Sequence, residues 1–140
     1  MSAPTSVLFV CVHNSGKSQI AAGIARHLAP QVRVESAGTD PSDHLHAGSV
    51  ETLAEVGIDI SDQVPRPITP DLIAAADVVV ILGTEAQVTT HAGTPVQTWP
   101  IDEPSLRGID GTERMQLMRD EITVRVRDLL GSDAPSPAER

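Results

Sequence analysis

A short apolar run, Val7–Val10, lies near the start of the chain and limits the folds that the chain can adopt. A continuous run of this length is typical of a β-strand buried on both faces. A loop containing glycine and serine, Asn14–Gly16, follows it, and apolar residues then recur at three- and four-residue spacing from Ile20. This spacing predicts a helix that runs to about His27 and is closed by Pro30. A strand buried on both faces needs a layer on each side, so the pattern indicates a layered α/β fold.

The rest of the chain continues the alternation of strand and helix. Further strands are predicted at residues 32–35, 77–82 and 96–99, and further helices at residues 47–56, 71–76 and 112–130. Thr69 is the expected N-cap of the helix at 71–76, with Pro70 at its first position. The connecting segments 36–41 and 100–111 are expected to be turn and loop. The sequence therefore predicts a three-layer α/β domain with a central, roughly four-stranded parallel sheet flanked by helices.

The predicted sheet also indicates where a ligand would bind. In parallel sheets of this kind, ligands lie beyond the carboxyl ends of the strands. The loops that follow Val10, Leu82 and Trp99 are therefore the candidate site loops.

Length and charge narrow the possible functions. The chain has 140 residues, which fits one catalytic domain over residues 1–131 with a flexible tail at 132–140. Its net charge of −9 disfavours nucleic acid and anionic lipid as partners. We find no apolar run long enough to span a membrane and no basic segment typical of a signal peptide, so we expect a cytoplasmic protein. The single cysteine, Cys11, excludes an intrachain disulfide and fits a reducing compartment.

The loop from Cys11 to Ser18 carries the chemistry, because it connects the first strand to the first helix. Amide groups in a tight loop that enters a helix point inward and bind anions. The same amides stabilise a cysteine thiolate, and Lys17 adds a positive charge. We expect the Ser18 hydroxyl to donate to the sulfur. The predicted oxyanion-binding residues are Val12, His13, Asn14, Ser15, Gly16, Lys17 and Ser18.

Other interpretations of this loop are weaker. A lone cysteine is more often a buried apolar residue, but its place at a strand-to-helix turn favours a nucleophile. Gly16 to Ser18 matches the end of a nucleotide-binding P-loop, yet Cys11 stands where the first glycine should be. No acidic residue directly follows the strand that ends at Leu82, as a P-loop enzyme would require. We interpret His13 as a spectator side chain, with electrostatic tuning of the thiolate as the alternative.

The remaining histidines do not predict a metal centre. None has metal-ligand spacing with other strong ligands, and the pair His44 and His46 is a weak signal. We predict no metal and no bound cofactor. The other histidines are His27 and His91.

Several motifs together resemble one known family. The chain contains VLFVCVHNSGKS, VESAGT, VGIDIS and WPIDEPS in this order. Over about residues 5–130 it resembles the low-molecular-weight tyrosine phosphatase superfamily, and most closely the arsenate reductases within it. The resemblance implies the three-layer fold, a nucleophilic Cys11 and a general acid from the loop after Trp99. In the family this acid is an aspartate directly before a proline; here Glu103 holds that position and Asp102 precedes it, so both are candidates.

The chain departs from the family at the end of the loop. The family has arginine where this chain has Lys17, and an ammonium cannot offer two oxygens the planar fork of a guanidinium. Arg66 and Arg107 are candidates to compensate, although we interpret both as surface arginines.

The missing cysteines indicate which reductant the resemblance implies. Thioredoxin-coupled members relay the reaction through two more cysteines after the strand that ends here at Leu82, and this chain has none. The chain therefore resembles the single-cysteine, mycothiol-dependent arsenate reductases of arsenic resistance. They are arsenate–mycothiol transferases, with mycothiol as co-substrate and mycoredoxin as downstream reductant. The alternatives are a tyrosine phosphatase that acts through phosphocysteine, and an oxyanion-binding or cysteine phosphocarrier domain. Against the tyrosine phosphatase, Ser105 and Leu106 follow Pro104 where an aromatic pair would grip the substrate ring.

Overall fold

A computed structural model describes residues 4–88 and 93–131. The expected tail at 132–140 lies outside the described residues. The strands are β1 (Ser6–Cys11), β2 (Arg33–Gly38), β3 (Val78–Leu82) and β4 (Val96–Trp99). The helices are α1 (Lys17–Leu28), α2 (Ala47–Ala54), α3 (Pro70–Ala75) and α4 (Gly111–Leu129), with a short 3-10 helix η1 (Pro104–Arg107). No helix in the described part of the chain is both long and apolar enough to cross a membrane.

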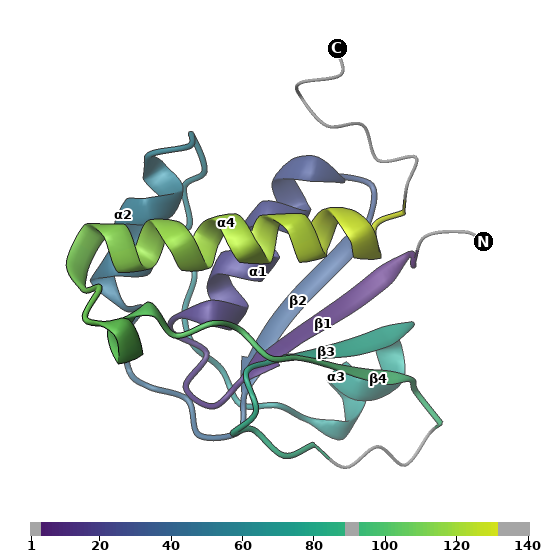
Figure 1. The fold of residues 1–140 in the computed structure, drawn as a ribbon. Coiled ribbons are helices and arrows are strands. Elements are labelled where there is room, and N and C mark those ends of the chain that lie inside the picture. Colours follow the sequence, from purple (N-terminus) through teal and green to yellow (C-terminus); the bar gives the residue numbers. More distant parts are fainter. Residues whose placement is uncertain (1–3, 89–92, 132–140) are drawn as a thin grey trace.

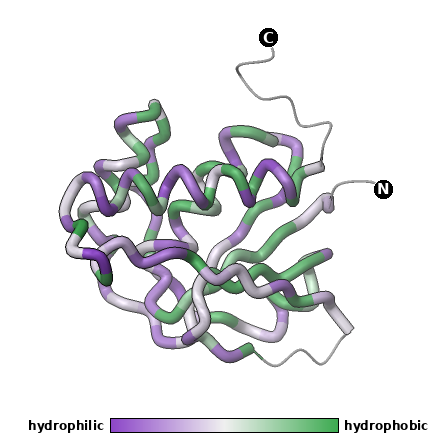
Figure 2. The backbone as a smooth tube through the Cα atoms, in the orientation of Figure 1, coloured by the Kyte–Doolittle hydropathy of each residue, from purple (hydrophilic) through white to green (hydrophobic). Residues whose placement is uncertain are grey.

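The four strands form one parallel sheet in the order β2-β1-β3-β4. Phe9 at the middle of β1 is paired with Ser36 on one side and with Val80 on the other. The centre of the sheet is thus a strand that has neighbours on both edges, which explains its continuous apolar sequence. Figure 2 shows β1 and β3 as mainly hydrophobic segments. The predicted three-layer α/β fold with a four-stranded parallel sheet is confirmed.

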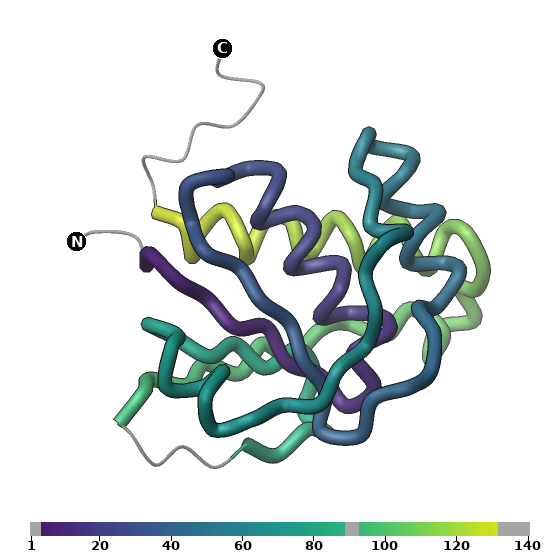
Figure 3. Tube along the Cα trace, turned by 180° about the vertical axis from the view of Figure 1, so that it is seen from behind, coloured from purple at the N-terminus to yellow at the C-terminus, as the bar shows by residue number. Residues whose placement is uncertain are grey.

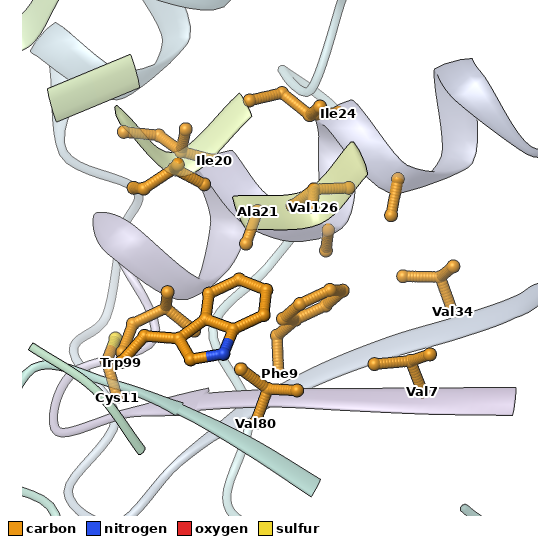
Figure 4. Packing of buried hydrophobic residues seen from close by; sticks show 14 of the residues in the cluster. Val7, Phe9, Cys11, Ile20, Ala21, Ile24, Val34, Val80, Trp99 and Val126 are labelled. Atoms are coloured by element: carbon orange, nitrogen blue, oxygen red, sulfur yellow. The ribbon is translucent and has the colours of Figure 1, made fainter. Parts of the chain in front are cut away.

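Helices cover both faces of the sheet (Figure 1). Alternate residues of β1 point to opposite faces: Val7 and Phe9 pack in the core shared with α1 and α4, while Leu8 and Val10 pack in the core shared with α3. The ring of Phe9 lies against Trp99, the last residue of β4, with 6.0 Å between ring centroids. Cys11 lies at one end of the same cluster (Figure 4), so the core anchors the strand end that carries the sulfur.

The N-terminus of α3 and the buried face of α4 are as the sequence predicts. The Thr69 side chain accepts a hydrogen bond from the Leu72 amide, so it caps α3, and Pro70 is the first helical residue. In α4, the side chains that recur at three- and four-residue spacing are buried in the core cluster that also contains residues of α1 and β1. They are Met115, Met118, Ile122 and Val126, with Leu129 partly buried at the end of the stripe.

The expected turn at 36–41 is wrong in its first half, because β2 continues to Gly38. Small residues are typical of turns, but here the last residue of the strand is paired on both sides. Its end pairs with Cys11 of β1, while the amide of Gly38 donates to Arg66 and its carbonyl accepts from Ile68. Figure 3 shows the segment between α2 and α3 running past this end of β2. The loop expected at 100–111 contains η1 instead of being wholly irregular.

Candidate active site

Cys11 is the last residue of β1, and α1 begins six residues later at Lys17. The sulfur therefore lies at the carboxyl end of the sheet, directly before the N-terminus of a buried helix. Only 9% of Cys11 is exposed. Its Sγ atom lies 3.0 Å from the Ser18 hydroxyl and accepts a hydrogen bond from the Asn14 amide at 3.3 Å. Both contacts favour a negatively charged sulfur.

Hydrogen bonds fix the direction of the Ser18 proton. The Arg66 amide can only donate, and it donates to Asn14 Oδ1 at 3.0 Å. The other end of that side chain is therefore the NH₂ group, which donates to Ser18 Oγ at 2.7 Å. Ser18 thus already receives a hydrogen bond from Asn14, and its own proton is available for the Cys11 sulfur.

Asn14 shapes the loop through its backbone as well. It is fully buried and has a φ of 51°, in the left-handed region that asparagine adopts more readily than most residues. Its carbonyl accepts a hydrogen bond from the Gln19 side chain at 3.0 Å. The turn is therefore held on both sides by buried polar contacts within the protein.

The carbonyl groups of the loop point away from the sulfur. Those of Cys11, Val12, His13 and Ser15 accept hydrogen bonds from the amides of Thr39, Asp40, Ser42 and His46, respectively. In a trans peptide the following N–H points the opposite way, so the amides of residues 12, 13, 14 and 16 face inward. Among the described residues, the amides of Val12, His13 and of residues 15–18 donate to no protein acceptor. This is the arrangement of an anion-binding loop.

A cavity of about 210 Å³ opens at this loop. Five of the seven predicted oxyanion-binding residues line it, and so does Cys11, while the side chains of Asn14 and Ser18 are buried away from it. The predicted residues that line it are Cys11, Val12, His13, Ser15, Gly16 and Lys17. The Lys17 ammonium lies beside Gly83, so the loop after β3 also borders the site, as its position beyond Leu82 predicts. His13 Nδ1 is within hydrogen-bond distance of the Asp40 carbonyl.

Neither candidate acid lines this cavity. Asp102 binds the Arg107 guanidinium with both oxygens, and both side chains are 52% exposed. Glu103 binds Arg114 with both oxygens at 2.7 Å and accepts from Ser105. The hydrogen bonds from Arg114 and then from Ser105 lower the pKa of Glu103 to about 2, although partial burial opposes the shift. Glu103 is therefore ionised at neutral pH and cannot donate a proton while this contact persists.

Four polar lining residues were not among the predicted site residues: His46, Ser49, Glu85 and Arg114. They come from α2 and its N-cap, from the loop after β3, and from the first turn of α4. Glu85 could have been predicted, because it lies in the loop directly after β3. Nothing local singles out Arg114 or Ser49, because only the packing of α2 and α4 around the N-terminus of α1 brings them to the loop.

The two arginines considered as substitutes for the missing loop arginine do not reach the cavity. Arg107 binds Asp102, and Arg66 binds Glu35 and the Ser36 carbonyl. The interpretation of both as surface arginines is consistent with these contacts. Arg114 is the guanidinium that does line the cavity. Within residues 4–88 and 93–131, no three histidine, cysteine or acidic side chains gather into a potential metal site.

Comparisons with known proteins identify the family. The family described as low molecular weight phosphotyrosine protein phosphatase matches residues 6–132. The chain is 37% identical over 128 residues to the arsenate reductase of Shouchella clausii, an alignment that covers 86% of this chain and 91% of the relative.

Two solved structures are also similar. A thioredoxin-dependent arsenate reductase of Corynebacterium glutamicum is 38% identical, with a TM-score of 0.75, over 91% of this chain and 60% of that chain. An arsenate reductase in the phosphate binding state is 32% identical, with a TM-score of 0.76, over 93% of this chain and 97% of that chain. On its match from residue 6 to residue 132, this chain belongs to the low molecular weight phosphotyrosine protein phosphatase family.

Proposed function

We propose that this protein is an arsenate reductase that transfers arsenate to an external thiol, with mycothiol as that thiol. One observation carries the proposal: the only cysteine of the sequence lies at an inward-facing ring of amides, so a nucleophile is present but no cysteine to resolve its adduct. The relatives named arsenate reductase favour arsenate as the oxyanion. Arsenate would be held by the loop amides and by the ammonium of Lys17.

The first step forms a covalent adduct on Cys11. The thiolate attacks arsenic, a sulfur–arsenic bond forms, and one arsenic–oxygen bond breaks. The departing oxygen takes a proton and leaves as water, while arsenic stays As(V). Of the two predicted acids we favour Asp102, because its exposed ion pair with Arg107 contributes little free energy and exchanges readily. Glu103 would first have to leave Arg114.

The second step frees Cys11. The mycothiol thiolate attacks the same arsenic, a new sulfur–arsenic bond forms, and the bond to Cys11 breaks to regenerate the thiolate. Arsenic remains As(V) in the product. A mycoredoxin thiolate then attacks the mycothiol sulfur, so that a mixed disulfide forms and the sulfur–arsenic electron pair reduces arsenic to As(III). The two electrons therefore come from two thiols outside this protein.

A phosphatase is the second candidate, because the family that matches residues 6–132 is described as a phosphotyrosine protein phosphatase. There the Cys11 adduct would be phosphocysteine, and water would resolve it. A non-catalytic oxyanion-binding or phosphocarrier domain is the third candidate, and it would need no acid.

Turnover of arsenate by the purified protein with mycothiol, mycoredoxin and a coupled NADPH readout tests the proposal. Hydrolysis of a small aryl phosphate is measured in parallel, and thioredoxin replaces mycothiol and mycoredoxin in a third assay. We expect arsenate turnover that requires both mycothiol and Cys11, with Cys11→Ser as the control variant. Turnover with thioredoxin alone would show that thioredoxin, and not mycothiol, is the co-substrate. Hydrolysis of the aryl phosphate without any arsenate turnover would make the protein a phosphatase.

A further inference from the structure

A second cavity adjoins the one that holds Cys11. It has a volume of about 290 Å³ and lies between α2 and the start of α4. His46, Arg114 and Met115 line both cavities, so these side chains form the wall that they share. The His46 ring packs closely there: a methyl group on Gly48 would lie 2.8 Å from its Cε1 atom and 3.1 Å from Met115. Because the two cavities share this wall, a molecule with its reactive end at Cys11 can extend over it into the second cavity.

A tetrahedral oxyanion does not need the second cavity. The loop amides and Lys17 border the first one, which is itself larger than a single oxyanion. The proposed reaction has a second, larger substrate, the thiol, and its sulfur must reach the arsenic on Cys11. The second cavity lies next to that position and is large enough for part of a small organic molecule.

The charges that line the second cavity are mainly acidic. Glu51 is exposed on α2 and forms no ion pair with any described residue, whereas Glu55, the C-cap residue of α2, is paired with Arg119. Arg114 is the guanidinium among the lining residues, but both oxygens of Glu103 bind it. Thr112 adds a hydroxyl group to the lining. A negatively charged ligand would be repelled here, whereas a neutral or cationic one would be accepted.

One buried polar atom in the wall of the first cavity has no hydrogen-bond partner among the described residues. The Ser49 side chain is fully buried, it lines the cavity that contains Cys11, and its Oγ atom has no hydrogen-bond partner among the described residues. Buried hydroxyl groups are almost always hydrogen-bonded, so an unpartnered one in a cavity wall indicates a ligand or water that satisfies it. Ser49 precedes Glu51 on α2, between the loop and the acidic lining.

We propose that the second cavity binds the body of the thiol co-substrate and selects a thiol without negative charge. This inference rests on the proposed thiol transfer, and it adds where the thiol lies and which class of thiol fits. The Glu51 side chain is the selective group: its charge attracts a cationic thiol and repels an anionic one. An uncharged, hydroxyl-rich thiol such as mycothiol meets the same requirement.

Three small thiols with the same two-carbon frame test this selectivity. They are cysteamine, which is cationic, 2-mercaptoethanol, which is neutral, and 2-mercaptoethanesulfonate, which is anionic. Arsenate turnover at limiting thiol is measured for the wild type and for Glu51→Lys, and the ratio of kcat/KM values is taken for each thiol. Intrinsic thiol reactivity cancels in that ratio. Asp71→Lys, on α3 at the opposite face of the sheet, makes the same change in net charge and is the matched control.

We expect Glu51→Lys to improve the anionic thiol relative to the cationic one by about tenfold, with the neutral thiol nearly unchanged. Glu51→Gln should give about half of this effect on a logarithmic scale, and Asp71→Lys almost none. Equal ratios for all three thiols in Glu51→Lys would overturn the docking site while leaving thiol transfer intact. Arsenate turnover that fails with every thiol, including mycothiol, while aryl phosphate hydrolysis persists, would instead overturn the proposed function.

Discussion

The side-chain amide of Asn14 donates to the hydroxyl of Ser18 at 2.7 Å, and this contact decides which way the Ser18 proton points. The Asn14 side chain is itself oriented by the Arg66 amide, which lies in the segment that pairs with the end of β2. A chain of hydrogen bonds thus runs from the edge of the sheet to the Cys11 sulfur. The groups that contact the Cys11 sulfur are thus held in place by residues that do not line the cavity.

Removal of the Ser18 hydroxyl should lower the reactivity of Cys11. A hydrogen bond to a charged acceptor contributes about 1.5–3 kcal/mol, so Ser18→Ala should slow alkylation of Cys11 by iodoacetamide at pH 7 by about tenfold or more. Mass spectrometry of the alkylated protein over time measures the rate. Ser15→Ala removes a hydroxyl from the same loop without a bond to the sulfur, and it should alkylate at the wild-type rate. Equal slowing in both variants would show that the Ser18 contact is not specific.

Restoration of the family arginine at position 17 should strengthen oxyanion binding. The Lys17 ammonium already lies at the cavity beside Gly83, and a guanidinium there would offer two donors in one plane. We expect Lys17→Arg to lower the inhibition constant of phosphate by about tenfold, since bidentate charge-assisted bonds exceed a single one. Competition between phosphate and arsenate gives this constant. An unchanged value would mean that the loop amides supply nearly all of the affinity.

Gly38 should tolerate no side chain, although it lies outside the loop. A methyl group there would lie 2.6 Å from the Val12 carbonyl oxygen and 3.0 Å from the backbone and side chain of Asn14. Backbone atoms cannot move aside cheaply, so Gly38→Ala should displace the loop. We expect turnover to fall by about tenfold or more and the melting temperature to drop, since overpacking costs about 1–3 kcal/mol. Wild-type turnover with normal stability would show that the loop is more adaptable than this contact implies.

Sequence patterns predicted the elements that depend on local rules and failed where distant segments meet. The strand at β1, the Thr69 cap and the apolar stripe of α4 all follow from spacing and residue type. The turn expected at Ser36 was wrong because a neighbouring segment pairs with those small residues. Arg114 was missed because its place in the cavity depends on how α4 packs over α1, which no pattern around residue 114 records.

The ion pair of Glu103 with Arg114 should make stability depend on pH in acid. The pKa of Glu103 falls from 4.5 to about 2 on folding, so the folded state favours the ionised form. Its contribution is complete above about pH 4.5 and is lost as pH falls toward 2. We expect Glu103→Gln to cost about 1 kcal/mol of unfolding free energy at pH 6 and much less at pH 2.5. Urea denaturation of both proteins at each pH measures the difference, and a constant difference would contradict the assignment.

The proton for the leaving oxygen should come from Asp102 or Glu103. Replacing both Asp102 and Glu103 with their amides should slow arsenate turnover by at least about tenfold, since proton transfer to the leaving oxygen contributes about 10²–10⁴-fold in such reactions. The single variants distinguish the two candidate acids. Asp102→Asn should account for most of the loss of turnover, because Glu103 is held ionised by Arg114. Turnover is compared under saturating arsenate and mycothiol.

Glu85→Gln provides the decisive comparison, because Glu85 is a carboxylate that lines the cavity with Cys11 in this structure. If Asp102 is the acid, Glu85→Gln should retain most of the turnover, and the loop that carries Asp102 must approach the cavity when arsenate binds. Full activity in the double amide variant together with loss in Glu85→Gln would transfer the role to Glu85. The proton would then come from the loop after β3 rather than from the loop after β4, and the family pattern would not apply to this chain.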